Sequence, residues 1–271
     1  MLTARILTGV TLLAACLAAI FLLPNHWWAA LTLAVFVRAA WEWGELAGYG
    51  RAARWGYCAV VLVSAVAIYA VSEAGSVVAP HVELEIVVYA LASAFWILLA
   101  PIWLARRWQT RLPVRAAAAG WIVLVPAWLA MARLQLDPAQ LLHLLGIVWL
   151  ADTAAFLAGR TWGRRKLAPA ISPGKTWEGV AGAIVAVAVY YVVLSRFTSA
   201  GSWAAGWGGA MVFAGVTAAS IVGDLFESWV KRRAGVKDSG ALLPGHGGIL
   251  DRIDGLTASM PLAALVTRYL G

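Results

Sequence analysis

The chain has 271 residues, of which 62% are hydrophobic and only 13% are charged. Soluble domains carry about 25% charged residues, so this composition excludes an ordinary soluble domain. The formal net charge of +8 could suit a nucleic acid, but the placement of the basic residues favours a membrane protein without a nucleic-acid partner. Long apolar runs without period-2 alternation predict transmembrane helices rather than a membrane barrel.

About nine segments are apolar enough to cross a membrane. Each approaches the ~20 residues that a helix needs to span about 30 Å of hydrocarbon. We therefore predict an all-α polytopic integral membrane protein with about nine transmembrane helices. In chain order, the predicted spans are 6–23, 27–47, 56–72, 86–104, 116–133, 140–159, 178–196, 205–231 and 255–270.

The charged residues predict the orientation of these spans. When the loops are assigned alternately to two sides, most of the 21 Lys and Arg residues fall on the side of the N-terminus, which the positive-inside rule makes cytoplasmic. The predicted topology is N-in and C-out, and three arginines near outer span ends could be accommodated by snorkelling. The cytoplasmic set is Arg5, Arg51, Arg54, Arg106, Arg107, Arg111, Arg115, Arg160, Arg164, Arg165, Lys166, Lys175, Lys231, Arg232, Arg233, Lys237 and Arg252; the outer acids are Glu73, Glu83, Glu85 and Asp137; the three arginines are Arg133, Arg196 and Arg268.

The first span contains Leu13-Ala14-Ala15-Cys16, which looks like a lipoprotein cleavage box. The apolar run continues to Leu23, and cleavage would spoil the alternation of loop charges, so we expect a retained span. The two cysteines, Cys16 and Cys58, have no metal or redox spacing. The 16 Trp residues are expected mainly at span edges.

The most informative polar residues lie in the second half of the chain. We predict that residues 1–140 form a helical scaffold with candidate dimer contacts. Residues 141–271 form the predicted catalytic region, with cytoplasmic loops at 160–177 and 232–254.

Ionisable residues inside spans need partners or a function, because each costs about 2.5–3.5 kcal/mol on insertion scales. Arg38, Glu42 and Glu45 share one helical face. We interpret them as a self-neutralising stripe that locks two helices, with a catalytic role as the alternative. Asp152 stands alone in WLADTAAFLAG, and a site residue and a partnered polar seam both remain open for it.

A stronger stripe lies in GDLFESWVK. Asp224, Glu227, Ser228 and Lys231 fall at i, i+3, i+4 and i+7, so two carboxylates, a hydroxyl and an ammonium share one helical face. A charge ladder between two helices would explain the pairing. It would not explain why the stripe runs directly into the polar stretch at 237–254, so we favour a functional site.

The stretch KDSGALLPGHGGILDRID at 237–254 combines hinges and charges. Asp251 and Asp254 share a face if a helix begins near Ile249, and clustered Asp oxygens favour a hard cation such as Mg²⁺. Gly247 and Gly248 let the backbone approach a ligand. The side chains of Lys237, His246 and Arg252 can bind phosphate oxygens. The set indicates phosphoryl chemistry more than a polar loop with helix caps.

These residues resemble a known family. The sequence SWVKRRAGVKDSGALLPGHGGILDRID (228–254) is similar to the signature of the CDP-diacylglycerol synthases, also called phosphatidate cytidylyltransferases. Segments 152–179 and 223–232 resemble the same family. The first 140 residues match only in hydropathy and in AWEWGEL (40–46). Thr153-Ala154-Ala155 depart from the Gly and Tyr that relatives often have near this point.

The resemblance implies transfer of CMP from CTP to phosphatidate, with Mg²⁺ and K⁺ as a candidate second ion. It also implies a homodimer in a bacterial inner membrane, in contact with membrane lipids. We expect catalytic roles for Asp224, Asp251, Asp254 and Lys231, the three aspartates as metal ligands. The expected substrate-binding residues are Asp152, Ser172, Lys175, Ser228, Arg232, Lys237, His246, Gly247, Gly248 and Arg252.

Two other functions remain open from the sequence. One is a related CTP-dependent lipid kinase acting on a prenol or a similar alcohol. The other is a polytopic transporter with Asp152 and Asp224 on an ion path, although the polar residues gather at one face of the membrane rather than near the midplane.

Overall fold

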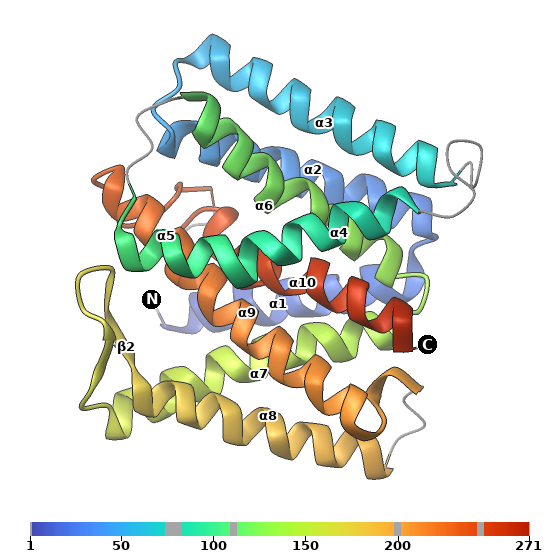
Figure 1. Ribbon diagram of the computed structural model, residues 1–271, viewed down its shortest axis with the longest axis vertical. Helices are drawn as coiled ribbons and strands as arrows, with labels where there is room; N and C mark the ends of the chain where they lie inside the picture. The colour runs from blue at the N-terminus through green and yellow to red at the C-terminus, as the bar shows by residue number, and fades with distance from the viewer. Residues whose placement is uncertain (1, 74–82, 109–112, 198–201, 243–246, 271) are drawn as a thin grey trace.

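The computed structural model describes residues 2–73, 83–108, 113–197, 202–242 and 247–270. Within these ranges the protein is almost entirely helical, and its only strands form one short hairpin (Figure 1). The segments are α1 (Leu2–Leu22), α2 (Asn25–Leu46), α3 (Arg51–Glu73), α4 (Leu84–Ala94), the π-helix η1 (Phe95–Leu99), α5 (Ala100–Arg106), α6 (Pro113–Leu134), α7 (Pro138–Trp162), β1 (Lys166–Ala168), β2 (Ser172–Thr176), α8 (Trp177–Phe197), the 3₁₀ turn η2 (Ser202–Ala204), α9 (Gly206–Arg233) and α10 (Leu250–Leu270).

The prediction of an all-α polytopic membrane protein agrees with the structure, while the number of nine spans stays a prediction. Among the described residues, six helical segments are long and apolar enough to cross a membrane. They are Arg51–Glu73, Leu84–Arg106, Pro113–Leu134, Pro138–Trp162, Trp177–Arg196 and Gly206–Arg233.

The helix α10 is not in this group of long apolar helices, and it is enclosed by protein over most of its length. Most of its residues from Ile253 to Ala264 are buried. Its hydroxyl groups on Thr257, Ser259 and Thr267 each donate to a carbonyl of the preceding turn. A helix enclosed by other helices can carry polar residues that a lipid-facing helix could not, so α10 has a lower hydropathy than its neighbours.

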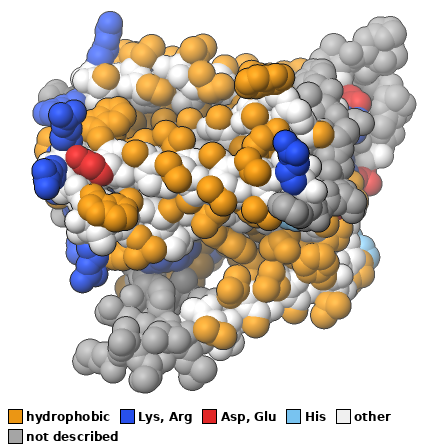
Figure 2. Space-filling view, turned by 90° about the horizontal axis from the view of Figure 1, so that it is seen from below, with side chains coloured by type: hydrophobic (Ala, Val, Ile, Leu, Met, Phe, Trp, Pro, Cys, Tyr) orange, Lys and Arg blue, Asp and Glu red, His pale blue; other side chains and the backbone are white. Residues whose placement is uncertain are grey.

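Successive helices run in alternating directions, so loops far apart in the sequence meet at one end. In Figure 1 the N-terminus, the hairpin and the turn from α9 into α10 lie at the left, and the C-terminus lies at the right. Figure 2 keeps this left–right direction and shows most of the visible Lys and Arg side chains at the left end. Basic side chains from loops that are far apart in the sequence therefore gather at one end of the helix bundle.

The opposite end carries ion pairs that the sequence analysis did not anticipate. The Arg133 guanidinium pairs with Glu73 and, at 2.5 Å from its Nε, with Glu85. Arg268 pairs with Glu83 at 2.7 Å. Arg133 and Arg268 are thus matched by the acidic residues of their own end, and this pairing explains their position better than snorkelling alone.

Several tryptophans connect neighbouring helices through hydrogen bonds. Trp28 on α2 donates its Nε1–H to the carbonyl of Met131, and Trp128 on α6 donates to that of Ala29, both at 3.0 Å. Trp43 donates to the Ala116 carbonyl at 2.9 Å. All three indoles are buried. A buried indole N–H needs an acceptor and finds one on the neighbouring helix, while edge anchoring stays a prediction for the tryptophans as a group.

Small residues bring the helices of the second half into close contact. A Cβ added at Gly223 of α9 would lie 2.5 Å from the Asp254 carbonyl oxygen of α10 and 2.9 Å from the Ala258 Cβ. A Cβ at Gly182 of α8 would lie 2.4 Å from the Cβ of Ala158 on α7. Transmembrane helices associate through such close backbone approach. The first contact also places Asp224 beside the start of α10.

We expect the substitution Gly182→Leu to destabilise the protein, because its side chain cannot enter the α7–α8 contact without moving a helix. Overpacking of this kind costs about 1–3 kcal/mol, which should lower the melting temperature of the purified protein in detergent. Gly56→Ala is the matched control, since a Cβ at Gly56 meets nothing within 4 Å. Equal melting temperatures for the two variants would contradict this account of the contact.

Candidate functional site

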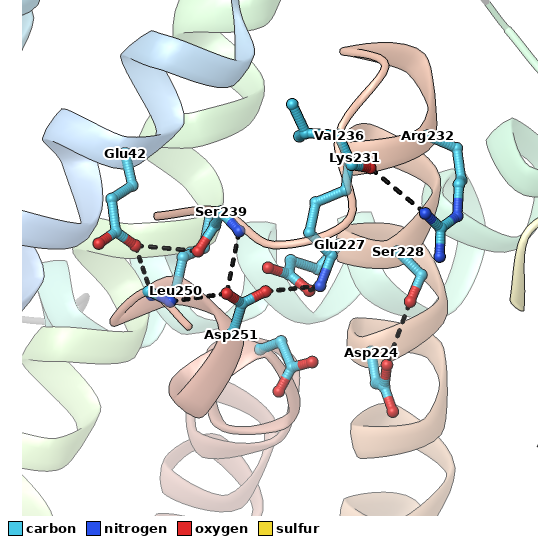
Figure 3. Close-up of polar contacts among 12 residues, drawn as sticks. Glu42, Asp224, Glu227, Ser228, Lys231, Arg232, Val236, Ser239, Leu250 and Asp251 are labelled. Atoms are coloured by element: carbon cyan, nitrogen blue, oxygen red, sulfur yellow. Dashed lines mark hydrogen bonds and ion pairs between the residues drawn. The ribbon is translucent and has the colours of Figure 1, made fainter. Parts of the chain in front are cut away.

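The polar residues of the second half meet at the hairpin end of the molecule. Figure 3 shows Lys231 of α9 reaching Asp251 in the first turn of α10, with Asp224 and Ser228 in contact with each other on α9. The hairpin between α7 and α8 approaches the same region through Lys175. Four elements, α7, β2, α9 and α10, therefore contribute to one site.

Lys231 connects the two principal helices of the site. Its Nζ lies 2.6 Å from Glu227 Oε2 on the same helix and 2.6 Å from Asp251 Oδ1 on α10. The side chains of all three residues are largely buried. A single ammonium thus contacts two carboxyl groups in a region of low dielectric, where an unpaired charge would be strongly unfavourable.

Asp251 also organises the loop that precedes its own helix. Its Oδ2 accepts hydrogen bonds from the backbone N–H of Ser239 at 2.9 Å and from that of Gly248 at 2.8 Å. Gly247 has φ of +80°, which favours glycine, and a Cβ there would lie 2.7 Å from Asp251 Oδ2. Both glycines thus let the backbone approach the Asp251 carboxylate, whereas the approach to a ligand that the sequence suggests for them stays a prediction.

The second ion pair of the site joins the hairpin to α9. Lys175 Nζ lies 2.5 Å from Asp224 Oδ2, and Ser228 donates to Asp224 Oδ1 over 3.4 Å. The hairpin was not foreseen in the sequence, where residues 160–177 read only as a polar loop. Its base is held by Glu178, whose carboxylate accepts the backbone N–H groups of Arg164 and Arg165 at 3.1–3.2 Å.

The hairpin leads directly into α8 through a side-chain cap. Thr176 Oγ1 accepts the backbone N–H of Gly179 at 3.1 Å, which is the geometry of an N-cap residue. Gly163, at the other end of the connection, is packed against Thr176 as well, since a Cβ there would lie 2.8 Å from the threonine hydroxyl oxygen. The two fixed ends hold the strand that carries Lys175.

Asp152 and Asp254 complete the charged region. The charges of Asp224, Asp152 and Lys175 all act on Asp254, and those of Asp224 and Lys175 act on Asp152. Asp254 Oδ1 also accepts the backbone N–H of Gly255 at 2.8 Å. Three carboxylates from three helices therefore lie within electrostatic range of Lys175, which pairs directly with Asp224, and their excess of negative charge is suited to a cation.

The donor atoms fit a hard cation, although the predicted three-aspartate cluster is not preformed. In the described residues, no three Asp, Glu, His or Cys side chains are grouped closely enough to hold a metal ion. Lysines take the place of a cation at Asp224 and Asp251. Glu227 Oε1 is buried and has no hydrogen-bond donor within the described structure. Carboxylate oxygens with unused capacity are what Mg²⁺ prefers.

The remaining residues predicted to bind substrate differ in their contacts and in their exposure. Ser172 begins β2, and Arg232 donates to the carbonyls of Ile171 at 3.4 Å and Val236 at 3.3 Å, so it links the hairpin to the end of α9. Lys237 and Arg252 are exposed, and Gly248 is buried. His246 lies outside the described residues.

Glu42 of α2 is a member of the site region that the sequence analysis placed elsewhere. It is 1% exposed, pairs with Arg38 at 3.3 Å, and accepts hydrogen bonds from Ser239, Ile249 and Leu250 at 2.9–3.1 Å. Glu45 pairs instead with Arg54 of α3 at 2.8 Å. The prediction of a self-neutralising stripe holds for Arg38 and Glu42 but not for Glu45, whose partner belongs to another helix. The spacing of these residues in the sequence could not reveal that Glu42 also binds the start of α10.

Comparison with known proteins covers the whole chain. The model of the cytidylyltransferase family matches residues 3–270. Phosphatidate cytidylyltransferase of Pseudomonas aeruginosa is 39% identical over 276 residues, covering 97% of this chain and 96% of its own length. The enzyme of that name from Haemophilus influenzae is 33% identical over 283 residues, covering 96% of each chain. The resemblance found in the motifs is confirmed, and the match includes the first 140 residues.

A shorter match reaches beyond bacteria. Phosphatidate cytidylyltransferase 4, chloroplastic, of Arabidopsis thaliana is 45% identical over 117 residues, which are 43% of this chain and 29% of the plant protein.

We expect Lys231→Gln to be strongly destabilising, because it leaves two largely buried carboxylates without their cation. Removing one partner of a buried pair costs about 3–5 kcal/mol, which thermal unfolding in detergent would detect. Arg232→Gln, one residue away, alters an exposed guanidinium and should cost about 1 kcal/mol or less. Similar losses of stability in both variants would show that the Glu227–Lys231–Asp251 bridge is not the feature that matters.

Proposed function

Because the chain belongs to the cytidylyltransferase family, we propose that it is a phosphatidate cytidylyltransferase, which converts CTP and phosphatidate into CDP-diacylglycerol and pyrophosphate. The relatives that match almost the full chain carry this name. The observation that carries the proposal is the gathering of Asp152, Asp224, Asp254 and Lys175 from four elements at one end of a membrane helix bundle. A lipid phosphate reaches such a site from the bilayer, and a nucleotide reaches it from water.

The proposed reaction is a direct displacement. A phosphate oxygen of phosphatidate attacks the α-phosphorus of CTP, a new P–O bond forms, and the bond from the α-phosphorus to the bridging oxygen of pyrophosphate breaks. Both reactants are anions, so neutralising and orienting them is the main task of the protein. A strong general base is not required, because the attacking phosphate oxygen already carries negative charge.

Basic and hydrogen-bonding groups would hold the phosphates in this reaction. Lys175 and Lys231 are anchored by carboxylates, so their ammonium groups are held in place at the site. Lys237, Arg232 and Arg252 supply further positive charge at the exposed rim. Hydrogen bonds from the remaining predicted residues would orient the phosphates, namely Ser172, Ser228, His246, Gly247 and Gly248, with Asp152 orienting a basic partner or the nucleotide.

A divalent cation would be held by the carboxylates of α9 and α10. We propose Asp224, Asp251 and Asp254 as its ligands, and K⁺ as a candidate second ion. When bound, Mg²⁺ withdraws negative charge from phosphate oxygens. Ligation by Asp224 and Asp251 requires that Lys175 and Lys231 release the carboxylate oxygens they now contact. The freed ammonium groups would then be available to substrate phosphates.

The cellular setting is part of the proposal. We propose nine transmembrane helices in an N-in and C-out arrangement, with the site at the cytoplasmic side of a bacterial inner membrane. The concentration of Lys and Arg at the hairpin end supports this orientation. The homodimer is proposed from the family resemblance, and light scattering of the purified protein in detergent would test it.

We expect a cysteine at Arg165 in the hairpin to be shielded from a membrane-impermeant maleimide in intact cells, whereas a cysteine at Asp137, between α6 and α7, should be labelled. Both residues would be placed in a chain lacking Cys16 and Cys58, and lysed cells should label both. Labelling of the Arg165 site in intact cells, or protection of the Asp137 site, would reverse the proposed orientation.

Labelled CTP tests the proposed reaction directly. The purified protein with phosphatidate and Mg²⁺ should transfer label from the α-phosphate of CTP into lipid, and should transfer none from the γ-phosphate. Chelation of Mg²⁺ should abolish the transfer. Appearance of γ-label in lipid would identify a lipid kinase instead, and substrate flux across sealed vesicles without CTP consumption would identify a transporter.

The variant Asp224→Asn serves as the control for the site. It should lower transfer about tenfold to a thousandfold, the range for loss of one preorganised electrostatic group, while its melting temperature shows that it remains folded. Near-normal turnover in this variant would place the reaction elsewhere in the molecule.

A further inference from the structure

Glu42 lies far from the motif-bearing half of the sequence but contacts it directly. It belongs to α2, in the region 1–140 predicted to be scaffold, yet its carboxylate lies at the start of α10. Oε2 accepts the Ser239 hydroxyl at 3.0 Å and the Leu250 backbone N–H at 2.9 Å, and Oε1 accepts the Ile249 backbone N–H at 3.1 Å (Figure 3). Both oxygens are therefore saturated by groups of the 237–254 stretch and by Arg38.

The arrangement has the chemistry of a helix cap supplied by a different helix. The first N–H groups of a helix have no partner within it, and they attract a negative charge. At the start of α10, the N–H group of its first residue and the two N–H groups just before it are bound by two acids with largely buried side chains. Glu42 binds the N–H groups of Ile249 and Leu250, while Asp251 binds that of Gly248.

Ser239 joins the two acids. Its hydroxyl donates to Glu42, and its backbone N–H donates to Asp251 Oδ2 at 2.9 Å. The chain of contacts therefore runs from Glu42 through Ser239 to Asp251, and from Asp251 Oδ1 to Lys231 at 2.6 Å. Any movement of the Glu42 carboxylate is transmitted to the side chain that holds Lys231.

Glycines enforce the close packing around Glu42. A Cβ at Gly248 would lie 2.2 Å from Ser239 Oγ and 2.5 Å from Glu42 Oε2, and a Cβ at Gly240 would lie 2.7 Å from Glu42 Oε1. No side chain larger than hydrogen fits at either position with Glu42 in place. The backbone at Gly240 and Gly248 therefore packs directly against the Glu42 carboxylate.

We propose that Glu42 is a positioning residue for the nucleotidyl-transfer site, and that it acts by fixing Asp251 and Lys231 through Ser239 and the first turn of α10. Glu42 contacts neither the proposed cation nor the phosphates, so it is not a catalytic residue. The inference rests on the proposed function only for its effect on turnover. The contact itself is independent of the reaction.

The test compares Glu42→Gln with Glu45→Gln on the same helix. The amide of Gln at position 42 replaces one acceptor oxygen by an NH2 donor. In one orientation this NH2 group faces the Ile249 N–H and Arg38, and in the other it faces the Leu250 N–H. In either orientation the contacts of one of the two carboxylate oxygens are lost. Glu45 pairs with Arg54 and is half exposed, without any recorded contact to residues 237–254. The substitution Glu45→Gln is therefore a matched control, because it removes one carboxylate charge from the same helix.

We expect Glu42→Gln to lower kcat about tenfold to a hundredfold, as misplacement of a site by about 1 Å does, with the KM for CTP changed less than about threefold. Hydrogen exchange at the amides of residues 239 and 248–250 should be at least about tenfold faster than in the Glu45→Gln variant. In an Asp251→Asn background, Glu42→Gln should lower the residual turnover by less than about twofold, because both changes act through one group. A residue needed only for folding would lower turnover by the same factor in both backgrounds.

Ser239→Ala provides a second route if Glu42→Gln does not fold, since it removes a single hydroxyl. It should accelerate exchange at the same amides and lower kcat by a smaller factor. Exchange rates and kcat in either folded variant equal to those of Glu45→Gln would overturn the proposal. If the unaltered protein transfers no CMP, the proposed function fails, while the exchange comparison still decides whether Glu42 holds the start of α10.

Discussion

Charges placed among apolar helices must be neutralised where they lie, and this requirement shapes the site end of the molecule. Lys231 lies between Glu227 and Asp251, Lys175 pairs with Asp224, and Arg38 pairs with Glu42. The Lys231–Asp251 and Lys175–Asp224 pairs join groups that the proposed reaction would also use. Since water cannot take over a lost contact in a buried region, the pairs fix helix positions as well as charge.

The charged helices also need to approach one another closely, and small residues at the helix contacts allow this approach. Gly223 lets α9 approach α10 at Asp254, so Asp224 and Asp254 come from adjacent turns of two touching helices. Gly159, Gly179 and Gly182 do the same for α7 and α8, which carry Asp152 and the end of the hairpin. The charge cluster thus depends on packing between faces that contain no charge.

The division into a scaffold and a catalytic region is too sharp in one respect. Residues 1–140 contain the motif AWEWGEL, and its Glu42 is integrated into the loop that precedes α10. The family model and the two full-length relatives also match this half. The first half therefore contributes to the geometry of the site even though the site's charged motifs lie in the second half.

The sequence by itself determined the helices, their alternating loop charges and the residues of the α9 stripe, because hydropathy and helical spacing are local properties. It also determined the family, through motifs that are contiguous in the chain. Only the tertiary structure decided that Lys231 bridges to Asp251, that Arg133 meets Glu85, and that Glu42 caps α10. These contacts join residues between 20 and 208 positions apart, and no periodicity within one segment records which distant segment will pack against it.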